Sequence, residues 1–286
     1  MPEIITLLSS ACDRLVTSGN ERCGYSNFSD PMKSKVPQVT FLFWLIKICA
    51  TTLGETGGDA VSMSLKLGYA ISTAIFFAFF LVTVIAQIRA KAFHPYLYWT
   101  VIVATTTVGT TTSDFLTRTA GLGYPGASIV LFLLVLVCLG VWRWKLGTVS
   151  VDHVTEPRSE SFYWATILAS NTLGTALGDA LADNESFGFG GAALVFGGAL
   201  AVLAVCYFFT KLSHAFLFWA AFILTRPLGA TLGDLLTKPH EEGGLELSRF
   251  ASSAVLFLFI AFAVWFSSRA LLAAARAERL SSREAT

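Results

Sequence analysis

Four aspartates recur at one position of a repeated pattern, and of all the residues in this chain they are best suited to binding a cation. They are Asp59, Asp114, Asp179 and Asp234. Each stands fifteen residues after a tryptophan and directly after a Gly or a Ser. Carboxylate oxygens are ligands for hard metal ions, and a carboxylate held in a low-dielectric setting can also carry a proton. The four acids therefore predict a site for metal ions, for protons or for both.

The spacing around each aspartate indicates an internal fourfold duplication. Each copy begins at a tryptophan, has small residues ten and fourteen positions later, has its Asp at fifteen and a Gly at twenty-four. Five matching positions in four copies without a gap indicate tandem repeats. The tryptophans, 55, 65 and 55 residues apart, are Trp44, Trp99, Trp164 and Trp219.

Composition places the chain in a membrane. Of its 286 residues 54% are hydrophobic and only 14% are charged, with a net charge of +1. These values are typical of integral membrane proteins, so the lipid bilayer is the expected partner. The chain has no basic stripe that would indicate a nucleic-acid partner. The five cysteines show neither disulfide-like nor metal-ligand spacing.

Apolar runs between charges predict eight transmembrane helices, two in each repeat, of about 20 residues each. The fold class is therefore all-α integral membrane. The predicted spans are 38–58, 67–88, 95–114, 121–142, 160–179, 187–209, 213–234 and 248–271. The repeats cover about 37–90, 91–148, 155–210 and 211–271. We expect a disordered extension over 1–36, with Met32 as an alternative start, and a cytoplasmic tail over 272–286.

The basic residues predict the orientation. Fourteen Lys and Arg residues lie in the termini and the loops between repeats, against four in the loops within repeats. By the positive-inside rule both termini are cytoplasmic. Because each repeat has an even number of spans, all four enter the membrane in the same sense, and their pseudo-symmetry axis lies along the membrane normal. The first span of each repeat then contributes to an inner ring, with the four aspartates at one depth.

A polar stripe runs along each inner span toward its aspartate. Residues four apart share a helix face. The stripes contain Thr51 with Glu55, Thr106 with Thr110, Asn171 with Thr175, and Arg226 with Ala230. Further hydroxyls flank them at Thr52, Thr105, Thr107, Thr172 and Thr225. We assign Thr51, Thr106, Asn171 and Thr175 as neutral ligands beside the acids.

Three charges break the fourfold symmetry, namely Glu55, Lys47 and Arg226. A charge inside a bilayer costs at least ~2.5–3.5 kcal/mol, so such residues usually face a bundle interior and form pairs. We expect Glu55 to pair with Arg226, whereas Lys47 either joins the interior or snorkels. The inner set then holds five acids against two bases, and this excess favours a cationic substrate. Oxygen ligands favour a hard metal ion.

Two repeated features admit two interpretations each. The tryptophans, at the cytoplasmic ends of the inner spans, are expected to anchor the membrane interface; the alternative is an aromatic plug on the inner face. Small residues four apart, such as Gly54 and Gly58, are expected to let helices pack closely. The alternative is a loosened helix that frees carbonyl oxygens toward a cavity.

The four tandem two-helix repeats with a shared Trp, and the opening VPQVTFLFWLIKICATTLGETGGDA, resemble a bacterial family of membrane proteins catalogued under a domain of unknown function. The resemblance covers about residues 36–271. It implies the fold and a place in the bacterial inner membrane, and it supplies no activity.

The residues themselves favour a membrane transporter for a cation, most suitably a hard metal ion exported in exchange for protons. A cation channel is the nearest alternative, because rings of carboxylates also select cations. A non-transport scaffold or sensor is the other. We expect neither an enzyme nor a cofactor, since the chain lacks a Ser/His or Cys/His nucleophile pair, HExxH and a phosphate-binding loop.

Overall fold

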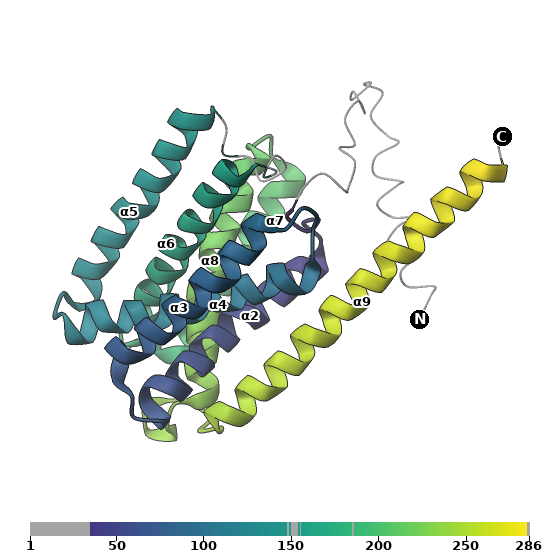
Figure 1. The fold of residues 1–286 in the computed structure, drawn as a ribbon. Helices are drawn as coiled ribbons and strands as arrows, with labels where there is room; N and C mark the ends of the chain where they lie inside the picture. Colours follow the sequence, from purple (N-terminus) through teal and green to yellow (C-terminus); the bar gives the residue numbers. More distant parts are fainter. Residues whose placement is uncertain (1–34, 148, 150–153, 155, 185, 285–286) are drawn as a thin grey trace. The chain divides into compact units, whose positions relative to one another are not determined.

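The computed structural model describes residues 35–147, 149, 154, 156–184 and 186–284, which fall in one compact unit (Figure 1). Within these ranges the chain is all-helical, with eight α-helices and no strand. The helices are α2 (Phe41–Asp59), α3 (Gly68–Arg89), α4 (Pro95–Asp114), α5 (Gly123–Leu146), α6 (Pro157–Ala182), α7 (Gly188–Phe209), α8 (His214–Thr237) and α9 (Arg249–Glu284). The expected disorder over 1–36 and the alternative start at Met32 fall almost wholly outside the described residues.

Local sequence accounts for several helix ends. Thr40 caps α2 by accepting a hydrogen bond from the backbone N–H of Phe43 at 3.2 Å. Pro95 and Pro157 stand at the first positions of α4 and α6, where a missing N–H costs nothing. α5 ends at Gly147, which has a left-handed conformation with φ of 75°.

Each repeat contains two helices, as predicted, and most ends agree within a few residues. The main difference is α9, which continues to Glu284 instead of ending at 271. Five helices are long and apolar enough to cross a membrane, namely α3, α5, α7, α8 and the 249–269 part of α9. α2, α4 and α6 contain more hydroxyl and charged residues, so they do not meet the same test of apolar character. These polar side chains are buried inside the bundle.

The first helices of the repeats form a closed ring. α2, α4, α6 and α8 pack in that cyclic order, and α8 returns to α2. The second helices cover the ring from outside: α3 packs on α4, α5 on α6, α7 on α8 and α9 on α2 (Figure 1). Each outer helix therefore covers the inner helix of the following repeat, and the last covers the first. The four repeats are interlocked.

The small residues let the inner helices approach closely. A methyl group on Gly54, Gly174 or Gly229 would collide with the next inner helix, and one on Gly109 would make a tight contact of 3.1 Å with it. The pairs in cyclic order are Gly54 with Thr106, Gly109 with Asn171, Gly174 with Arg226, and Gly229 with Thr51. The close-packing interpretation is thus confirmed. The helices continue unbroken through these glycines, which does not support the alternative of a loosened helix.

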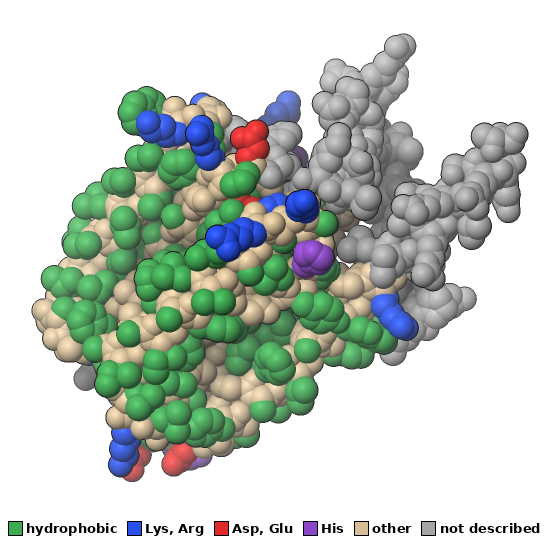
Figure 2. All heavy atoms as spheres, viewed as in Figure 1, with side chains coloured by type: hydrophobic (Ala, Val, Ile, Leu, Met, Phe, Trp, Pro, Cys, Tyr) green, Lys and Arg blue, Asp and Glu red, His purple; other side chains and the backbone are tan. Residues whose placement is uncertain are grey.

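The outer helices present apolar side chains outward. Figure 2 shows hydrophobic side chains spread over the visible face between tan backbone and uncharged polar side chains, with charged side chains mainly toward its upper and lower edges. α7 buries only Phe189 and Ala192 among its side chains. In the most apolar stretch of α3, 28% of the residues are buried. Such a surface is suited to contact with lipid.

The tryptophans close one end of the ring, together with the aromatic residue before each of them. The pairs are Phe43–Trp44, Tyr98–Trp99, Tyr163–Trp164 and Phe218–Trp219. Each tryptophan contacts the leading aromatic of the preceding repeat, with ring centroids 5.5 Å apart for Phe43 and Trp99, 5.5 Å for Tyr98 and Trp164, 6.1 Å for Tyr163 and Trp219, and 5.8 Å for Phe218 and Trp44. These eight residues form what we call the aromatic layer.

The expected role as interface anchors is therefore wrong for three of the four tryptophans, whereas Trp44 is partly buried and its expected role stays a prediction. Trp99, Trp164 and Trp219 are at most 5% exposed. The reason is the packing of the aromatic layer: each of the three lies against aromatic rings of the preceding inner helix, and Trp219 also packs against Trp142 of α5. The alternative, an aromatic plug on the inner face, is the arrangement observed.

Replacement of Gly54 by Ala tests the close approach. A Cβ at this position would lie 2.9 Å from the backbone carbonyl carbon of Thr106, whereas a Cβ at Gly140, on the outer helix α5, would meet nothing within 4 Å. We expect Gly54→Ala to destabilise the protein by ~1–3 kcal/mol through overpacking. Gly140→Ala should be neutral or stabilising, because Ala favours the helix over Gly. Unfolding in detergent measures both, and equal stability of the two variants would contradict the packing argument.

Candidate functional site

The inner helices arrange their side chains in layers along the ring. Along α2, Phe43 and every fourth residue after it are buried, namely Lys47, Thr51, Glu55 and Asp59. We call each of these residues, together with the residues at the same position of the other three repeats, a layer. The lysine layer holds Lys47, Ile102, Ile167 and Phe222. The threonine layer holds Thr51, Thr106, Asn171 and Arg226. The glutamate layer holds Glu55, Thr110, Thr175 and Ala230, and the aspartate layer holds the four aspartates. All of these side chains are buried.

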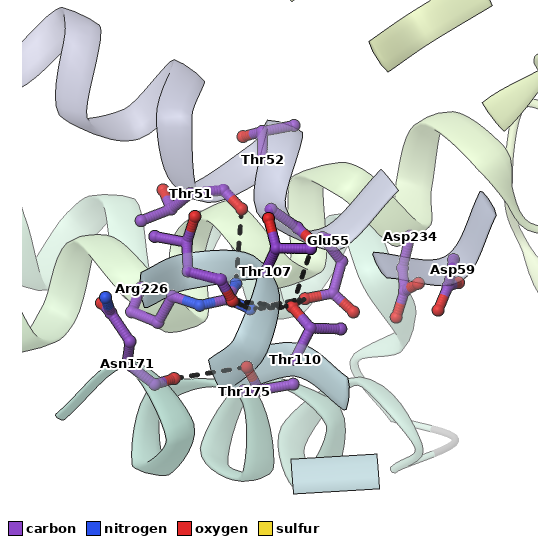
Figure 3. A network of polar contacts seen from close by, with 12 residues as sticks. Thr51, Thr52, Glu55, Asp59, Thr107, Thr110, Asn171, Thr175, Arg226 and Asp234 are labelled. Carbon is purple, nitrogen blue, oxygen red and sulfur yellow. Dashed lines mark hydrogen bonds and ion pairs between the residues drawn. The ribbon is translucent and has the colours of Figure 1, made fainter. Parts of the chain in front are cut away.

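Arg226 reaches across the ring to Glu55. Its Nη2 donates to Glu55 Oε2 at 2.9 Å and to the Thr110 hydroxyl, and its Nη1 donates to the backbone carbonyl of Thr51 at 3.4 Å (Figure 3). The arginine is 0% exposed. The predicted pair is confirmed, and it ties α8 to both α2 and α4.

Lys47 lies inside the ring and does not snorkel. It is fully buried, its Nζ donates to Asn171 Oδ1 at 3.4 Å, and it lies 4.0 Å from the ring centroid of Phe222. The Asn171 amide nitrogen donates to the Thr105 hydroxyl at 3.0 Å. Both ends of the Asn171 side chain are therefore engaged within the ring.

The hydroxyls assigned as neutral ligands make helix hydrogen bonds. Thr51 donates to the carbonyl of Thr225 at 3.2 Å, and Thr106 donates in the same way to Ala50 at 3.1 Å. Thr175 bonds to the carbonyl of Asn171 at 3.3 Å. These bonds join neighbouring inner helices or turns of one helix. None of the four assigned residues is part of the candidate metal-binding group described next, which consists of acids alone.

Three acids from three helices gather at the boundary of the glutamate and aspartate layers. Glu55, Asp179 and Asp234 each present one carboxylate oxygen within 4.8 Å of the others, and all three are buried. We call them the carboxylate cluster. Two oxygens bound to one ion at ~2.3 Å lie at most ~4.6 Å apart, so a small inward movement suffices to hold a hard cation. Asp179 makes no ion pair with any described residue.

The other two aspartates are outside the cluster and are paired with bases. Asp114 Oδ1 lies 3.2 Å from Arg118 Nε. Asp59 Oδ2 lies 3.4 Å from Lys238 Nζ and 3.7 Å from Arg249 Nε. The four aspartates are thus not equivalent, although they share one layer.

These bases correct the charge count made from the sequence. Arg118, Lys238 and Arg249 join Lys47 and Arg226, so five bases face the five acids and the predicted excess of three negative charges is wrong. Two of the added bases were detectable, because Arg118 and Lys238 each stand four residues after an aspartate, on the same helix face. The contact of Lys238 with Asp59 requires the ring closure from repeat four to repeat one.

Lys238 links the cluster to Asp59. Its Nζ lies 3.3 Å from Asp234 and 3.4 Å from Asp59, just beyond the end of α8. Burial by itself would lower the pKa of this ammonium, but the carboxylates of Asp234 and Asp59 outweigh burial and raise the pKa above its ordinary value. Lys238 is therefore a fixed positive charge at this end of the ring.

Comparison with known proteins identifies the repeats. Four segments match the family described as Repeat of Unknown Function (DUF347), at residues 42–93, 97–148, 162–213 and 217–270. The chain belongs to this family. Each DUF347 segment begins two residues before its tryptophan and contains one inner and one outer helix, which confirms the resemblance to a four-repeat family. No curated protein and no solved structure matches the chain.

A double-mutant cycle tests the pair of Arg226 and Glu55. Arg226→Met or Glu55→Gln alone leaves a buried charge without its partner, and we expect each to destabilise the protein by ~3–5 kcal/mol. The double variant should lose much less than the sum of the two, because it removes both charges together. Arg89→Met, at an exposed residue ending α3, is the control and should change stability by less than ~0.5 kcal/mol. Additive losses, measured by unfolding in detergent, would show that the two residues are not coupled.

Proposed function

We propose that the protein is a membrane transporter for a cation, most suitably a hard metal ion exported in exchange for protons. The carboxylate cluster carries the proposal, because it brings three buried acids from α2, α6 and α8 to within reach of one ion. The ligands are all oxygens, which suit Mn²⁺, Mg²⁺ or Ca²⁺ better than soft ions.

The carboxylate cluster has one more negative charge than the bases that contact it. Its three carboxylates contact two bases, Arg226 at Glu55 and Lys238 at Asp234. The remaining negative charge has no ion-pair partner in the described part of the chain. A bound cation supplies one or two positive charges, and a proton supplies one. Metal ions and protons are therefore alternative occupants of the same three acids, which is the requirement for exchange.

The proposal includes a placement in the membrane. The proposal has all eight helices spanning the bacterial inner membrane, with the ring axis along the membrane normal and both termini in the cytoplasm. The apolar outer helices and the excess of Lys and Arg in the termini and the loops between repeats support it. The aromatic layer would then face the cytoplasm, and the aspartate layer would face the periplasm.

Two features favour a transporter over a channel. Arg226 spans the ring from α8 to Thr110 of α4, between the threonine and glutamate layers (Figure 3). Eight packed aromatic rings fill the aromatic layer. A permanently open path would have to pass both. A transporter can open the path past Arg226 and the path past the aromatic layer at different times. This explains most simply why the site is buried and closed at one end.

The test uses Mn²⁺ as the probe and Asp179→Asn as the main variant. Asp179 has no ion-pair partner among described residues, so this change removes a ligand charge without leaving a base unpaired. We expect wild-type proteoliposomes to move Mn²⁺ and the variant to move it at least about tenfold more slowly, with Mn²⁺ binding weakened by a similar factor. Glu242→Gln, an exposed acid in the 3₁₀ turn His240–Glu242, is the control and should match the wild type.

Three outcomes would count against this function. Failure of the wild-type protein to bind or move Mn²⁺, Mg²⁺ or Ca²⁺ would remove it. Unchanged transport in Asp179→Asn would remove the proposed site. Single-channel currents in planar bilayers would identify a channel instead.

Reporter fusions test the orientation. We expect a fluorescent protein fused after residue 286 to be fluorescent and alkaline phosphatase at the same place to be inactive, since the C-terminus is cytoplasmic under the proposal. Phosphatase inserted in the loop at 239–247 should be active. The opposite pattern at both sites would reverse the orientation of the two layers.

A further inference from the structure

One half of the aromatic layer is polar. Among the leading aromatics of the four repeats, α4 and α6 contribute Tyr98 and Tyr163, whereas α2 and α8 contribute Phe43 and Phe218. The two tyrosine hydroxyls lie 2.6 Å apart and both side chains are 0% exposed. The layer is therefore sealed by hydrocarbon on the side of α2 and α8 and by a hydroxyl pair on the side of α4 and α6.

The hydroxyl pair has one proton more than its own hydrogen bond uses. Each tyrosine hydroxyl can donate one proton, and the mutual bond uses one of the two. The other O–H has no acceptor among the described residues. Leaving a buried donor without a partner is unfavourable, so this O–H points to a further polar group on that side of the layer.

Other unpartnered polar groups lie on the same side. Glu160 stands three residues before Tyr163 on α6, is 1% exposed, and pairs through Oε2 with Lys35 at 2.8 Å. Its Oε1 has no hydrogen-bond partner in the described ranges, and the same is true of the indole N–H of Trp164 and of both polar atoms of Gln87. Lys35 Nζ also donates to the carbonyl of Ile88 at 2.9 Å, which places Glu160 beside the end of α3.

The second repeat has an indole at the position of Gln87, whereas the equivalent residues of repeats three and four, Tyr207 and Phe262, are exposed. Gln87 and Trp142 both stand 43 residues after the tryptophan of their repeat. Trp142 packs its ring against Tyr163 and Trp219, with centroids 6.5 and 5.8 Å away. In the first repeat a small carboxamide stands at this position, and by the symmetry of the repeats its counterparts of Tyr163 and Trp219 are Tyr98 and Trp164. The replacement exchanges apolar volume for two donors and one acceptor.

The unpartnered groups match what water can satisfy. Glu160 Oε1 and the Gln87 carbonyl need donors, whereas the Gln87 amide and the Trp164 indole need acceptors. A water molecule donates two hydrogen bonds and accepts two, and buried waters typically bridge groups of this kind. A metal ion fits less well, because the indole N–H and the amide N–H would point donors at a cation.

We propose that Glu160, Gln87, Trp164 and the Tyr98–Tyr163 pair hold a small water cluster through which protons cross the aromatic layer. The inference rests on the proposed exchange of a cation for protons and assigns the proton its route. Each water or hydroxyl accepts one proton and releases another, so no group on the route is left with a changed charge. Glu160 takes up the proton at the outer end, where Lys35 and Tyr163 are its charged and titratable neighbours. On the inner side Lys47 of the lysine layer lies one helix turn further along α2. It passes the proton on by releasing one ammonium proton toward the carboxylates before it accepts one from the hydroxyl side, so its charge is also restored.

The route is tested by removing the two hydroxyls only. Tyr98→Phe/Tyr163→Phe installs the residue that repeats one and four already carry at this position, so the layer should keep its packing. Tyr96→Phe, at a 53% exposed tyrosine on α4, is the matched control. Proteoliposomes loaded with a pH-sensitive dye are exposed to a Mn²⁺ gradient, and Mn²⁺ movement and internal pH are followed together. Mn²⁺ binding to the purified proteins is measured by calorimetry.

We expect Mn²⁺ to drive proton movement in the wild type and in Tyr96→Phe, and the double variant to slow both fluxes about tenfold or more. Mn²⁺ binding should be unchanged in the double variant, because the carboxylate cluster lies several layers away. A weaker Mn²⁺ affinity in the double variant would indicate a structural role and overturn the route. Wild-type proton flux in the double variant would overturn it too.

The same experiment separates the two proposals. Mn²⁺ movement without proton movement in the wild type would overturn the proton route and leave the cation transporter standing. Absence of Mn²⁺ movement in the wild type would overturn the transporter, and the route with it.

Discussion

The close approach of the four inner helices is the constraint on which the rest of the structure depends. Each first glycine leaves room for a side chain of the next inner helix, and the last repeat meets the first in the same way. The approach holds equivalent residues at equal heights, so the ring has layers rather than a continuous polar lumen. One long side chain spans the ring, because Arg226 of α8 pairs with Glu55 of the neighbouring α2 and also donates to Thr110 of the opposite helix α4. The outer helices then lock each repeat onto its successor.

The fourfold duplication determines the arrangement of the helices, and the residues that differ among the repeats determine the chemistry of the site. A ring with four identical copies would have four equivalent aspartates and a uniform aromatic layer. Here Glu55 and Arg226 each appear in one repeat only, and Lys238 reaches from the fourth repeat to Asp59 of the first. These single-copy residues give each aspartate a different environment, and Asp179 is the one without an ion-pair partner among described residues.

Much of this architecture could be predicted from the sequence, for physical reasons. Helical periodicity placed Glu55 and Asp59 on one face, and the cost of a buried charge predicted the pair of Glu55 with Arg226. Burial of the tryptophans could not be predicted, because a tryptophan near a helix end suits a membrane interface equally well. Whether a tryptophan is buried or lies at the interface depends on how the helices pack, which only the structure shows. The cyclic closure of the ring decides which base meets Asp59, and no spacing within one repeat carries that information.

The two ends of the ring differ in how they are held, and this difference bears on access to the carboxylate cluster. The aromatic end is closed by buried rings, each of which contributes on the order of 1.5–3 kcal/mol by its removal from solvent. The aspartate end is held by ion pairs of long side chains, and those of Arg118 and Arg249 are 41% and 22% exposed. Partly exposed pairs contribute only ~0–1 kcal/mol each. The pairs of Arg118 and Arg249 therefore hold the aspartate end less firmly than the buried rings hold the aromatic end, and the buried Lys238 bridge is the main contact to be opened there. An ion would reach Glu55, Asp179 and Asp234 from the aspartate side, whereas the aromatic side would yield only to a rearrangement of whole helices.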